Sequence, residues 1–334
     1  MRLEMRFLVG VILVATLAGA EERPTYRCYR VGTPLRIDGK LEDAAWEALP
    51  RVTGFTLIDR GRGVYASEQT LVRAGWDDSG LYISFMCMEP EISRIKTQAK
   101  ERDGRVWADD SIQVFLDIPR SRERSTLMRF ILNTANVQCD EMGGDFGWNR
   151  EWKSAVVVGD GFWSVEIGIP FSQLGATPKT GDAWGGNFTR KECGSEDAQF
   201  SAWSYTAGTF IAPKLLGDFV FVGSPAGPQE AVVEEERLNG GYLAWLQGEV
   251  EKARVGMTAA MKEVEGLLKD AKDAGAWRAR FEGVAGRYET ALSRFEGAAV
   301  SLETCVREGP LIGAAASEYE QMEAEFQVQL LLAE

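Results

Sequence analysis

The segment GRVWADDSIQVFLD, residues 104–117, holds the side chains best suited to chemistry. Asp109 and Asp110 are adjacent carboxylates that follow Trp107 by two and three positions. Two carboxylates hydrolyse a glycosidic bond when they lie about 5 to 9.5 Å apart across it. Adjacent residues at the start of a strand point to opposite sides, so this pair does not suit that reaction. We interpret these aspartates as residues that cap a loop, bind calcium or orient a hydroxyl-binding edge.

Trp107 is the residue of this segment best suited to binding. A pyranose has C–H groups on its faces and hydroxyls at its edge, so a sugar site needs a flat apolar ring and a few polar groups. Trp107 follows the charged, glycine-containing stretch 100–106 and stands outside the strand alternation. We expect an exposed sugar platform, with local packing as the alternative. Trp148 and Trp152 flank a turn and could line the same cleft. Five tryptophans in strand patterns are expected in the core: Trp46, Trp76, Trp163, Trp184 and Trp203.

The chain contains no histidine. Ser-His-Asp and Cys-His catalysis and histidine-ligated zinc or haem are therefore excluded. An odd number of cysteines cannot pair completely within one chain, and Cys139 with Cys193 is a possible disulfide. The five cysteines are Cys28, Cys87, Cys139, Cys193 and Cys305. They show no metal-ligand spacing.

The first 20 residues have the composition of an export signal. Arg2 and Arg6 precede an apolar run that ends at Ala20 and is too short to span a membrane. We predict cleavage after Ala20 and a soluble protein that is extracellular or periplasmic. The formal net charge of −13 disfavours nucleic acid and anionic lipid as partners.

Residues 21–222 consist of short strand patterns separated by turns. In the clearest hairpin, apolar residues alternate over 72–76, a turn occupies 77–80, and the alternation returns over 81–85. Ile112, Val114 and Leu116 alternate in the same way. No amphipathic helix separates these strands. The pattern predicts a mainly β fold, an antiparallel β-sandwich of jelly-roll type.

Composition changes at 223–229, which predicts a linker before a helical region over 230–334. Apolar residues with 3,4 spacing run from Leu243 to Ala274 and again from Trp277 to Cys305, before Gly309-Pro310. Two such helices predict an antiparallel coiled-coil hairpin, followed by a shorter helix from about 311 to 332. Asn239-Gly240-Gly241 argues against helix before about residue 241. We expect a self-contained hairpin, with an oligomerisation or docking arm as the alternative.

Six segments occur in the order that is typical of carbohydrate-binding module family 9, which residues 30–222 resemble. They are IDGKLEDAAWEALP, GWDDSGLYISFMCMEP, WADDSIQVFLD, FILN, GFWSVEIGIPFSQLG, and SAWSY with FIAPKLLGDFVF. The resemblance implies a β-sandwich that binds sugars without cleaving them, often at the reducing end of a chain. Members are commonly attached to secreted glycan-degrading enzymes, and some hold structural calcium.

The resemblance also implies that two aromatic side chains clamp the sugar. They fall on Trp107 and on Phe210, where the family pattern has tryptophan. The polar residue on the following strand, usually glutamate, falls on Gln113, which can both donate and accept hydrogen bonds. Ile131 stands where the family has arginine, and Ala207 stands where it has a loop asparagine. These departures affect the expected sugar rather than the expected fold.

We therefore expect a secreted, non-catalytic carbohydrate-binding protein that serves polysaccharide recognition or catabolism, with an oligo- or polysaccharide as its partner. The expected site residues are Trp107, Phe210, Gln113, Asp109, Asp110 and Trp148. One alternative is a structural envelope protein that uses the sandwich and the helical arm for protein contacts or self-association. Another is a carboxylate-dependent glycoside hydrolase, with Glu89, Glu166 or Asp117 as the possible partner of an aspartate.

Overall fold

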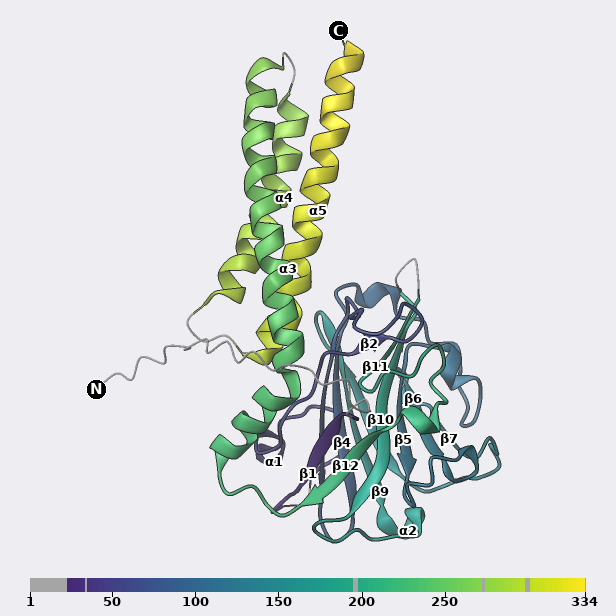
Figure 1. Cartoon of the computed structure of the whole chain (residues 1–334). Helices are drawn as coiled ribbons and strands as arrows, with labels where there is room; N and C mark the ends of the chain where they lie inside the picture. The colour runs from purple at the N-terminus through teal and green to yellow at the C-terminus, as the bar shows by residue number, and fades with distance from the viewer. Residues whose placement is uncertain (1–22, 34, 195–197, 272–273, 298–300, 334) are drawn as a thin grey trace, which may run out of the picture.

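The structure of the chain, a computed structural model, describes residues 23–33, 35–194, 198–271, 274–297 and 301–333. The export signal predicted for residues 1–20 lies outside these residues. A β-rich part carries an arm of long helices, and α5 ends at the far end of that arm (Figure 1). Among the described helices, none is both long and apolar enough to cross a membrane.

Twelve strands form one continuous, mostly antiparallel sheet in the described residues. The order across the sheet is β7-β6-β5-β10-β12-β1-β3-β4-β9-β8, and β11 joins β10 to β2. The strands are β1 (Thr25–Arg30), β2 (Thr56–Leu57), β3 (Thr70–Trp76), β4 (Gly80–Met88), β5 (Ser111–Asp117), β6 (Met128–Asn133), β7 (Gln138–Met142), β8 (Lys153–Val158), β9 (Phe162–Pro170), β10 (Ala183–Glu192), β11 (Gln199–Ala202) and β12 (Gly217–Val222).

The predicted mainly β, antiparallel character is confirmed, but two separate sheets are not observed. Strand β1 is parallel to both of its neighbours, β12 and β3, and it joins the two halves into one curled sheet. These pairings connect residues about 45 to 195 positions apart along the chain, as in Tyr29 with Gly75 and Thr25 with Asp218. The alternation of apolar and polar residues along a strand does not predict these long-range pairings.

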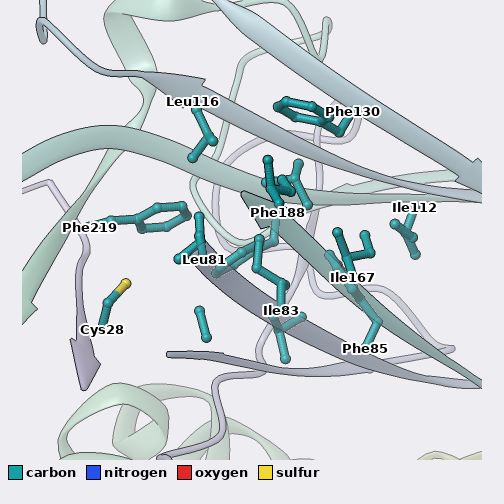
Figure 2. Close-up of a cluster of buried hydrophobic side chains, with 14 of the residues drawn as sticks. Cys28, Leu81, Ile83, Phe85, Ile112, Leu116, Phe130, Ile167, Phe188 and Phe219 are labelled. Carbon is teal, nitrogen blue, oxygen red and sulfur yellow. The ribbon is translucent and has the colours of Figure 1, made fainter. Parts of the chain in front are cut away.

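The two halves of the sheet enclose one hydrophobic core (Figure 2). Strand alternation places Ile112, Val114 and Leu116 of β5 on the inner face, as predicted. They pack in one cluster with residues of the other half of the sheet, including Leu81, Ile83, Phe85 and Ile167. The five tryptophans expected in the core are all buried. Since Ile112, Val114 and Leu116 face inward, the intervening residues Gln113 and Phe115 lie on the outer face.

Short helical segments connect some of the strands. They are the α-helices α1 (Ala44–Glu47) and α2 (Phe171–Leu174), and the 3-10 turns η1 (Ile92–Arg94), η2 (Val106–Ala108), η3 (Arg124–Thr126) and η4 (Pro213–Leu215). The turn η2 contains Trp107 and ends just before β5, so the start of β5 fixes the position of this ring.

Three helices build the arm: α3 (Pro228–Asp270), α4 (Gly275–Phe295) and α5 (Leu302–Ala333). Tyr319 and Phe326 of α5 share a core with Val264 of α3 and Phe281 of α4. Three helices were predicted, but in place of a self-contained hairpin with a separate, shorter third helix, all three pack together and α5 is longer than α4.

The break predicted at Gly309-Pro310 is wrong, because Pro310 lies inside α5. A Cβ atom on Gly309 would lie 2.7 Å from Leu246 Cδ1, so this glycine allows α5 to pack closely on α3. Helix α3 begins at Pro228, within the predicted linker, and the prediction of no helix before residue 241 is also wrong.

The first half of α3 is docked on the β-rich part. The side chain of Asn239 accepts a hydrogen bond from Thr53 N (2.8 Å) and donates one to Arg51 O (2.8 Å). Arg51 also forms an ion pair with Glu235, with Nη2 2.6 Å from Oε1. Tyr242 and Leu246 of α3, together with Leu302 and Val306 of α5, pack on Leu71 and Met88. These tertiary contacts explain why a segment with two glycines is helical despite its low propensity.

Candidate functional site

Polar side chains gather on the outer face of β5, β6, β7 and β10. Gln113 of β5 lies opposite Thr189 of β10 and Ile131 of β6. On the neighbouring row, Arg129 of β6 lies opposite Glu141 of β7. Because side chains two residues apart share a face of a strand, these residues form one patch.

Arg129 is the centre of this patch. Its Nε donates to Gln113 Oε1 (2.9 Å), and its Nη1 lies 3.3 Å from Glu141 Oε1. The guanidinium also lies 5.6 Å from the ring centroid of Phe115. Burial lowers the pKa of Arg129, and the neighbouring Glu141 opposes that shift. We call Gln113, Arg129 and Glu141 the outer-face network.

The network has unused hydrogen-bonding capacity. Among the residues that the structure describes, Glu141 Oε2, Ser111 Oγ and Thr189 Oγ1 are buried and have no hydrogen-bond partner. A buried polar group without a partner costs about 1 to 3 kcal/mol. Three unsatisfied polar atoms therefore lie on this face of the sheet.

Two groups of aromatic rings flank the network. Trp107 is partly buried and lies 5.0 Å from Phe146 between ring centroids, in a cluster that includes Ile131. Phe210 packs with Phe115 in another cluster. Gln113 has Ile131 beside it on β6 and Phe115 two residues along β5, so it lies between the two clusters.

Phe210 is not exposed as the expected second platform would be. Only 9% of the residue is accessible, and it packs against Phe200, with ring centroids 5.9 Å apart. Its contacts are those of a packed side chain. Trp148 lies elsewhere, with its ring against Phe130 (5.9 Å between centroids) and the Arg150 guanidinium 4.4 Å away. Phe130 faces the core, so the structure does not bring Trp148 to the outer-face network.

The two aspartates fix the loop that carries Trp107. Asp109 accepts hydrogen bonds from Gln98 N and Ala99 N (both 3.0 Å) and from Asn133 Nδ2 (2.9 Å). Asp110 accepts hydrogen bonds from Lys96 N (2.7 Å) and Cys193 N (2.9 Å). Both are buried. They cap the loop, as one of our interpretations stated, and their oxygens point at backbone amides rather than across a shared opening.

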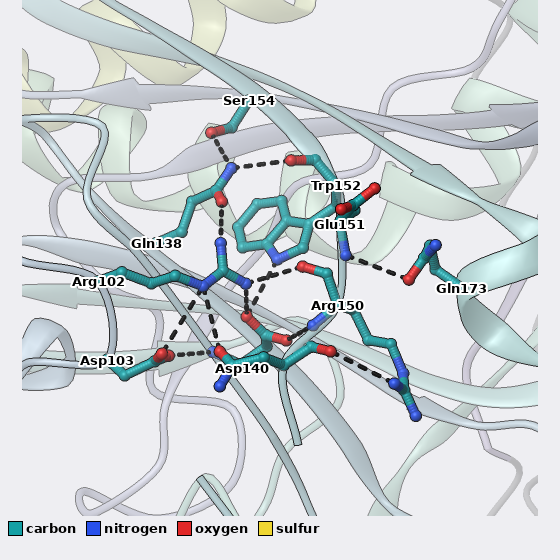
Figure 3. A network of polar contacts seen from close by, with 10 residues as sticks. Arg102, Asp103, Gln138, Asp140, Arg150, Glu151, Trp152, Ser154 and Gln173 are labelled. Atoms are coloured by element: carbon teal, nitrogen blue, oxygen red, sulfur yellow. Dashed lines mark hydrogen bonds and ion pairs between the residues drawn. The ribbon is translucent and has the colours of Figure 1, made fainter. Parts of the chain in front are cut away.

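A second network anchors the same loop on its other side (Figure 3). Arg102 donates to Gln138 Oε1 (2.6 Å) and to Arg150 O (2.8 Å), and it pairs with the buried carboxylate of Asp140. Asp140 also accepts hydrogen bonds from Arg150 N (2.7 Å) and Trp152 Nε1 (3.3 Å). The loop of Trp107 is thereby tied to β7 and to the 145–152 loop, which limits its freedom to move.

Two of the three other carboxylates considered for hydrolysis, Glu166 and Asp117, also have structural contacts. Glu166 accepts hydrogen bonds from Gly39 N (2.8 Å) and Trp46 Nε1 (2.8 Å), and it holds the 38–41 turn against β9. Asp117 accepts a hydrogen bond from Arg122 N (2.7 Å) and holds the turn after β5. Both are buried, and their oxygens are used in these structural contacts.

A comparison with known protein families identifies the family of the β-rich part. The model of the family described as carbohydrate family 9 binding domain-like matches residues 37–224. The chain belongs to this family. The helical arm lies outside the match.

Solved structures of carbohydrate-binding modules are similar to part of this chain. The family 9 module of Caldicellulosiruptor kristjanssonii in complex with cellotriose is 20% identical, with a TM-score of 0.47 over 60% of this chain and 95% of that chain. The same organism's module in complex with glucose is 20% identical, with a TM-score of 0.46 over 60% and 98%. No curated protein matches the chain.

Among the described residues of the family 9-like domain, Glu89, Asp110 and Glu192 form a group of carboxylates to consider for calcium. Oxygens of Glu89, Asp110 and Glu192 lie within 4.8 Å of one another, and all three residues are buried. Arg190 Nη2, however, lies 3.0 Å from Glu89 Oε2, and both Asp110 oxygens accept backbone hydrogen bonds. Burial raises the pKa of Glu89 to about 7. Calcium prefers six to eight free oxygen ligands, so this arginine-compensated group does not fit a calcium site.

The five cysteines of the chain are all free. Cys139 packs beside Val106 and Ile131, and Cys193 Sγ donates to Ala108 O at 3.5 Å. The possible Cys139–Cys193 disulfide is therefore not formed. Burial raises the pKa of Cys139 to about 12 and that of Cys193 to about 11, which makes both thiols poor nucleophiles.

Arg129 and Glu141 are the residues of the family 9-like domain that our sequence analysis missed. We noted Ile131 where an arginine was expected, yet Arg129 stands two residues earlier on the same face of β6. The alternation in MRFILN, residues 128–133, contained that signal. Glu141 had no local signal, because its place depends on the register between β6 and β7.

Proposed function

We propose that the protein is a non-catalytic carbohydrate-binding protein whose sugar contacts the outer-face network and Trp107. Membership of a carbohydrate-binding family supports this class of ligand. The observation that carries the assignment to this face is the unpartnered, buried Glu141 Oε2 beside the Arg129–Gln113 hydrogen bond.

The chemistry of the patch suits a pyranose. Arg129 and the Gln113 amide donate hydrogen bonds, and Glu141 accepts them, which matches the vicinal hydroxyls of a sugar. Charge-assisted hydrogen bonds of this kind are about twice as strong as neutral ones. The partly exposed ring of Trp107 offers an apolar surface for the C–H face of the sugar. The outer-face network would determine which sugar binds, because its hydrogen-bond donors and acceptors are already held in place.

The carboxylates support the non-catalytic role. Asp109, Asp110, Asp117 and Glu166 are buried and hydrogen-bonded to backbone amides. A glycosidase needs one carboxyl group that protonates the leaving oxygen and another that faces the same bond. None of these four groups is placed for such a role.

Calorimetric titration with a panel of neutral mono- and oligosaccharides tests the proposal. We expect Trp107→Ala to lower the affinity at least about fivefold, since stacking on one aromatic ring is worth about 1 to 3 kcal/mol. Trp148→Ala is the matched control, because it removes a second partly exposed tryptophan that lies away from the network. Equal losses in both variants, or no binding by the intact protein, would contradict the assignment of this face. Melting temperatures of both variants separate loss of binding from loss of fold.

We further propose that the protein is exported, with cleavage after Ala20, and that it serves polysaccharide recognition outside the cytoplasm. The charged, apolar and small-residue regions of 1–20 support export. Amino-terminal sequencing of the protein from the culture fluid or periplasm tests this directly. A retained Met1 would overturn it.

A further inference from the structure

A cavity of about 600 Å³ lies away from the outer-face network. The 54–65 segment forms one side, the 203–215 segment forms another, and Arg23 and Pro24 complete the lining. None of Trp107, Gln113, Arg129 and Glu141 lines it. Its volume falls within the range of about 300 to 1,000 Å³ that is typical of small-molecule sites.

The charge of this cavity differs from that of the whole protein. Arg23, Arg62 and Lys214 line it, and no aspartate or glutamate stands among its described lining residues. The chain as a whole has a formal net charge of −13. Arg23 and Lys214 in one concave site create a positive local potential, which favours an anionic ligand.

Aromatic rings form part of the cavity wall. Tyr65, Trp203 and Tyr205 all line it, and the Arg62 guanidinium lies 5.1 Å from the ring centroid of Tyr205. Rings beside cations suit a ligand that combines apolar C–H faces with an acidic group. Thr56 and Ser204 lie in the same wall and add hydroxyl groups.

The aromatic surface continues from the cavity onto the helical arm. The ring of Tyr65 lies 4.6 Å from that of Trp245, which is on α3 and 40% exposed. Tyr242 lies next to both, with ring centroids 5.0 Å from Tyr65 and 5.8 Å from Trp245. The hydrogen bonds of Asn239 fix this part of α3 on the β-rich part. The arm therefore adds a platform that lies outside the family 9-like region.

We propose that this cavity is a second carbohydrate site, which binds an acidic saccharide. The charged pyranose lies against Tyr65 and Tyr205, and its carboxylate or sulfate contacts Lys214 and Arg23. The adjoining sugar unit stacks on Trp245. This inference goes beyond the site proposed above and uses none of its residues, so either can fail without the other.

Titration of the full chain with three matched ligands tests the inference. The ligands are trigalacturonate, a sulfated galactotriose and neutral galactotriose, in low salt. We expect an acidic trisaccharide to bind at least tenfold more tightly than the neutral one. The two acidic ligands distinguish recognition of a carboxylate from recognition of a sulfate. If neither binds more tightly than neutral galactotriose, the inference is overturned.

Two exposed lysines provide a charge-matched comparison. Lys214→Gln removes a cation from the cavity, whereas Lys179→Gln removes one from an exposed position outside it. We expect at least a tenfold loss of affinity for the acidic ligand in Lys214→Gln and less than a twofold change in Lys179→Gln. Equal losses would indicate attraction by overall charge and would overturn the site.

Two further variants separate the parts of the site. Trp245→Ala should weaken the acidic trisaccharide at least threefold and leave binding of monomeric galacturonate unchanged. An equal effect on both ligands would overturn the platform on the arm. Trp107→Ala should leave binding of the acidic ligand unchanged, which distinguishes this site from the outer-face network, and a matching loss would overturn their separation.

Discussion

Arg129 on β6 lies directly opposite Glu141 on β7, and the two buried side chains form an ion pair with Nη1 3.3 Å from Oε1. The same arginine holds Gln113 on β5. A charge pair with one free carboxylate oxygen is thus built into the face where we propose that the sugar binds.

Loss of one member of this pair should destabilise the fold. Arg129→Met leaves Glu141 buried and uncompensated, and such losses cost about 3 to 5 kcal/mol. The double variant Arg129→Met/Glu141→Leu removes both charges and should recover at least half of that free energy. Urea unfolding of the two variants beside the unchanged protein measures this. A single variant as stable as the parent would show that the pair is solvated rather than buried.

Glu89 should make stability depend on pH. Its pKa is raised to about 7 by burial, despite the attraction of Arg190, whereas its unfolded value is 4.5. The folded protein therefore binds the proton more tightly, and the stability from Glu89 is fully present below about pH 4.5 and lost as the pH rises through about 7. A difference of about 2.5 pH units corresponds to about 3 kcal/mol.

Glu89→Gln tests this dependence, because an amide cannot ionise. We compare the unfolding free energy of the variant with that of the parent at each pH. As the pH rises from 5 to 8, this difference should shift in favour of the variant by up to about 3 kcal/mol. Asp110 and Glu192 lie beside Glu89 and are present in both proteins. The difference in unfolding free energy between the variant and the parent therefore reports on Glu89. Parallel stability curves across this range would mean that Glu89 titrates normally.

Docking of α3 should depend on Asn239 and not on its glycine neighbour. Asn239→Ala leaves Thr53 N and Arg51 O without their partner and should cost about 2 to 4 kcal/mol. Gly240 is exposed, and a Cβ atom there would meet nothing within 4 Å. Gly240→Ala should therefore stabilise the protein by about 0.5 to 1 kcal/mol. Thermal unfolding of both variants tests this, and destabilisation by Gly240→Ala would argue against helix at that position.

The buried cysteines should resist alkylation until the protein unfolds. Burial raises the pKa of Cys87 and Cys139 to about 12 and that of Cys193 to about 11, and it raises the pKa of Cys28 further. Thiolate is the reactive form, so iodoacetamide at pH 8 should modify none of these four in the native protein. In urea without reductant, mass spectrometry should find all of them modified. A pair that becomes reactive only after reduction would reveal a disulfide.

The sequence allowed good predictions where strand alternation and the order of motifs carried the signal, whereas the local glycine and proline signals at 239–241 and 309–310 were misleading. Alternation in 111–117 placed Ile112, Val114 and Leu116 inside, and the order of six segments identified the family. The position of Asp109 and Asp110 before a strand gave loop capping as one of three open roles. Alternation depends on residues within a few positions of one another, and it needs no distant contact to appear in the sequence.

Only the tertiary structure determined how these elements combine. Strand β1 joins the halves of the sheet through pairings far along the chain, and Asn239 makes its helix stable through contacts with Thr53 and Arg51. Close packing on Leu246 keeps Gly309 helical. The cavity of Arg23, Tyr65 and Lys214 likewise collects residues from three separate segments. In each case the deciding free energy comes from burial and hydrogen bonding between distant residues, which outweighs local propensity and has no periodic signature in the sequence.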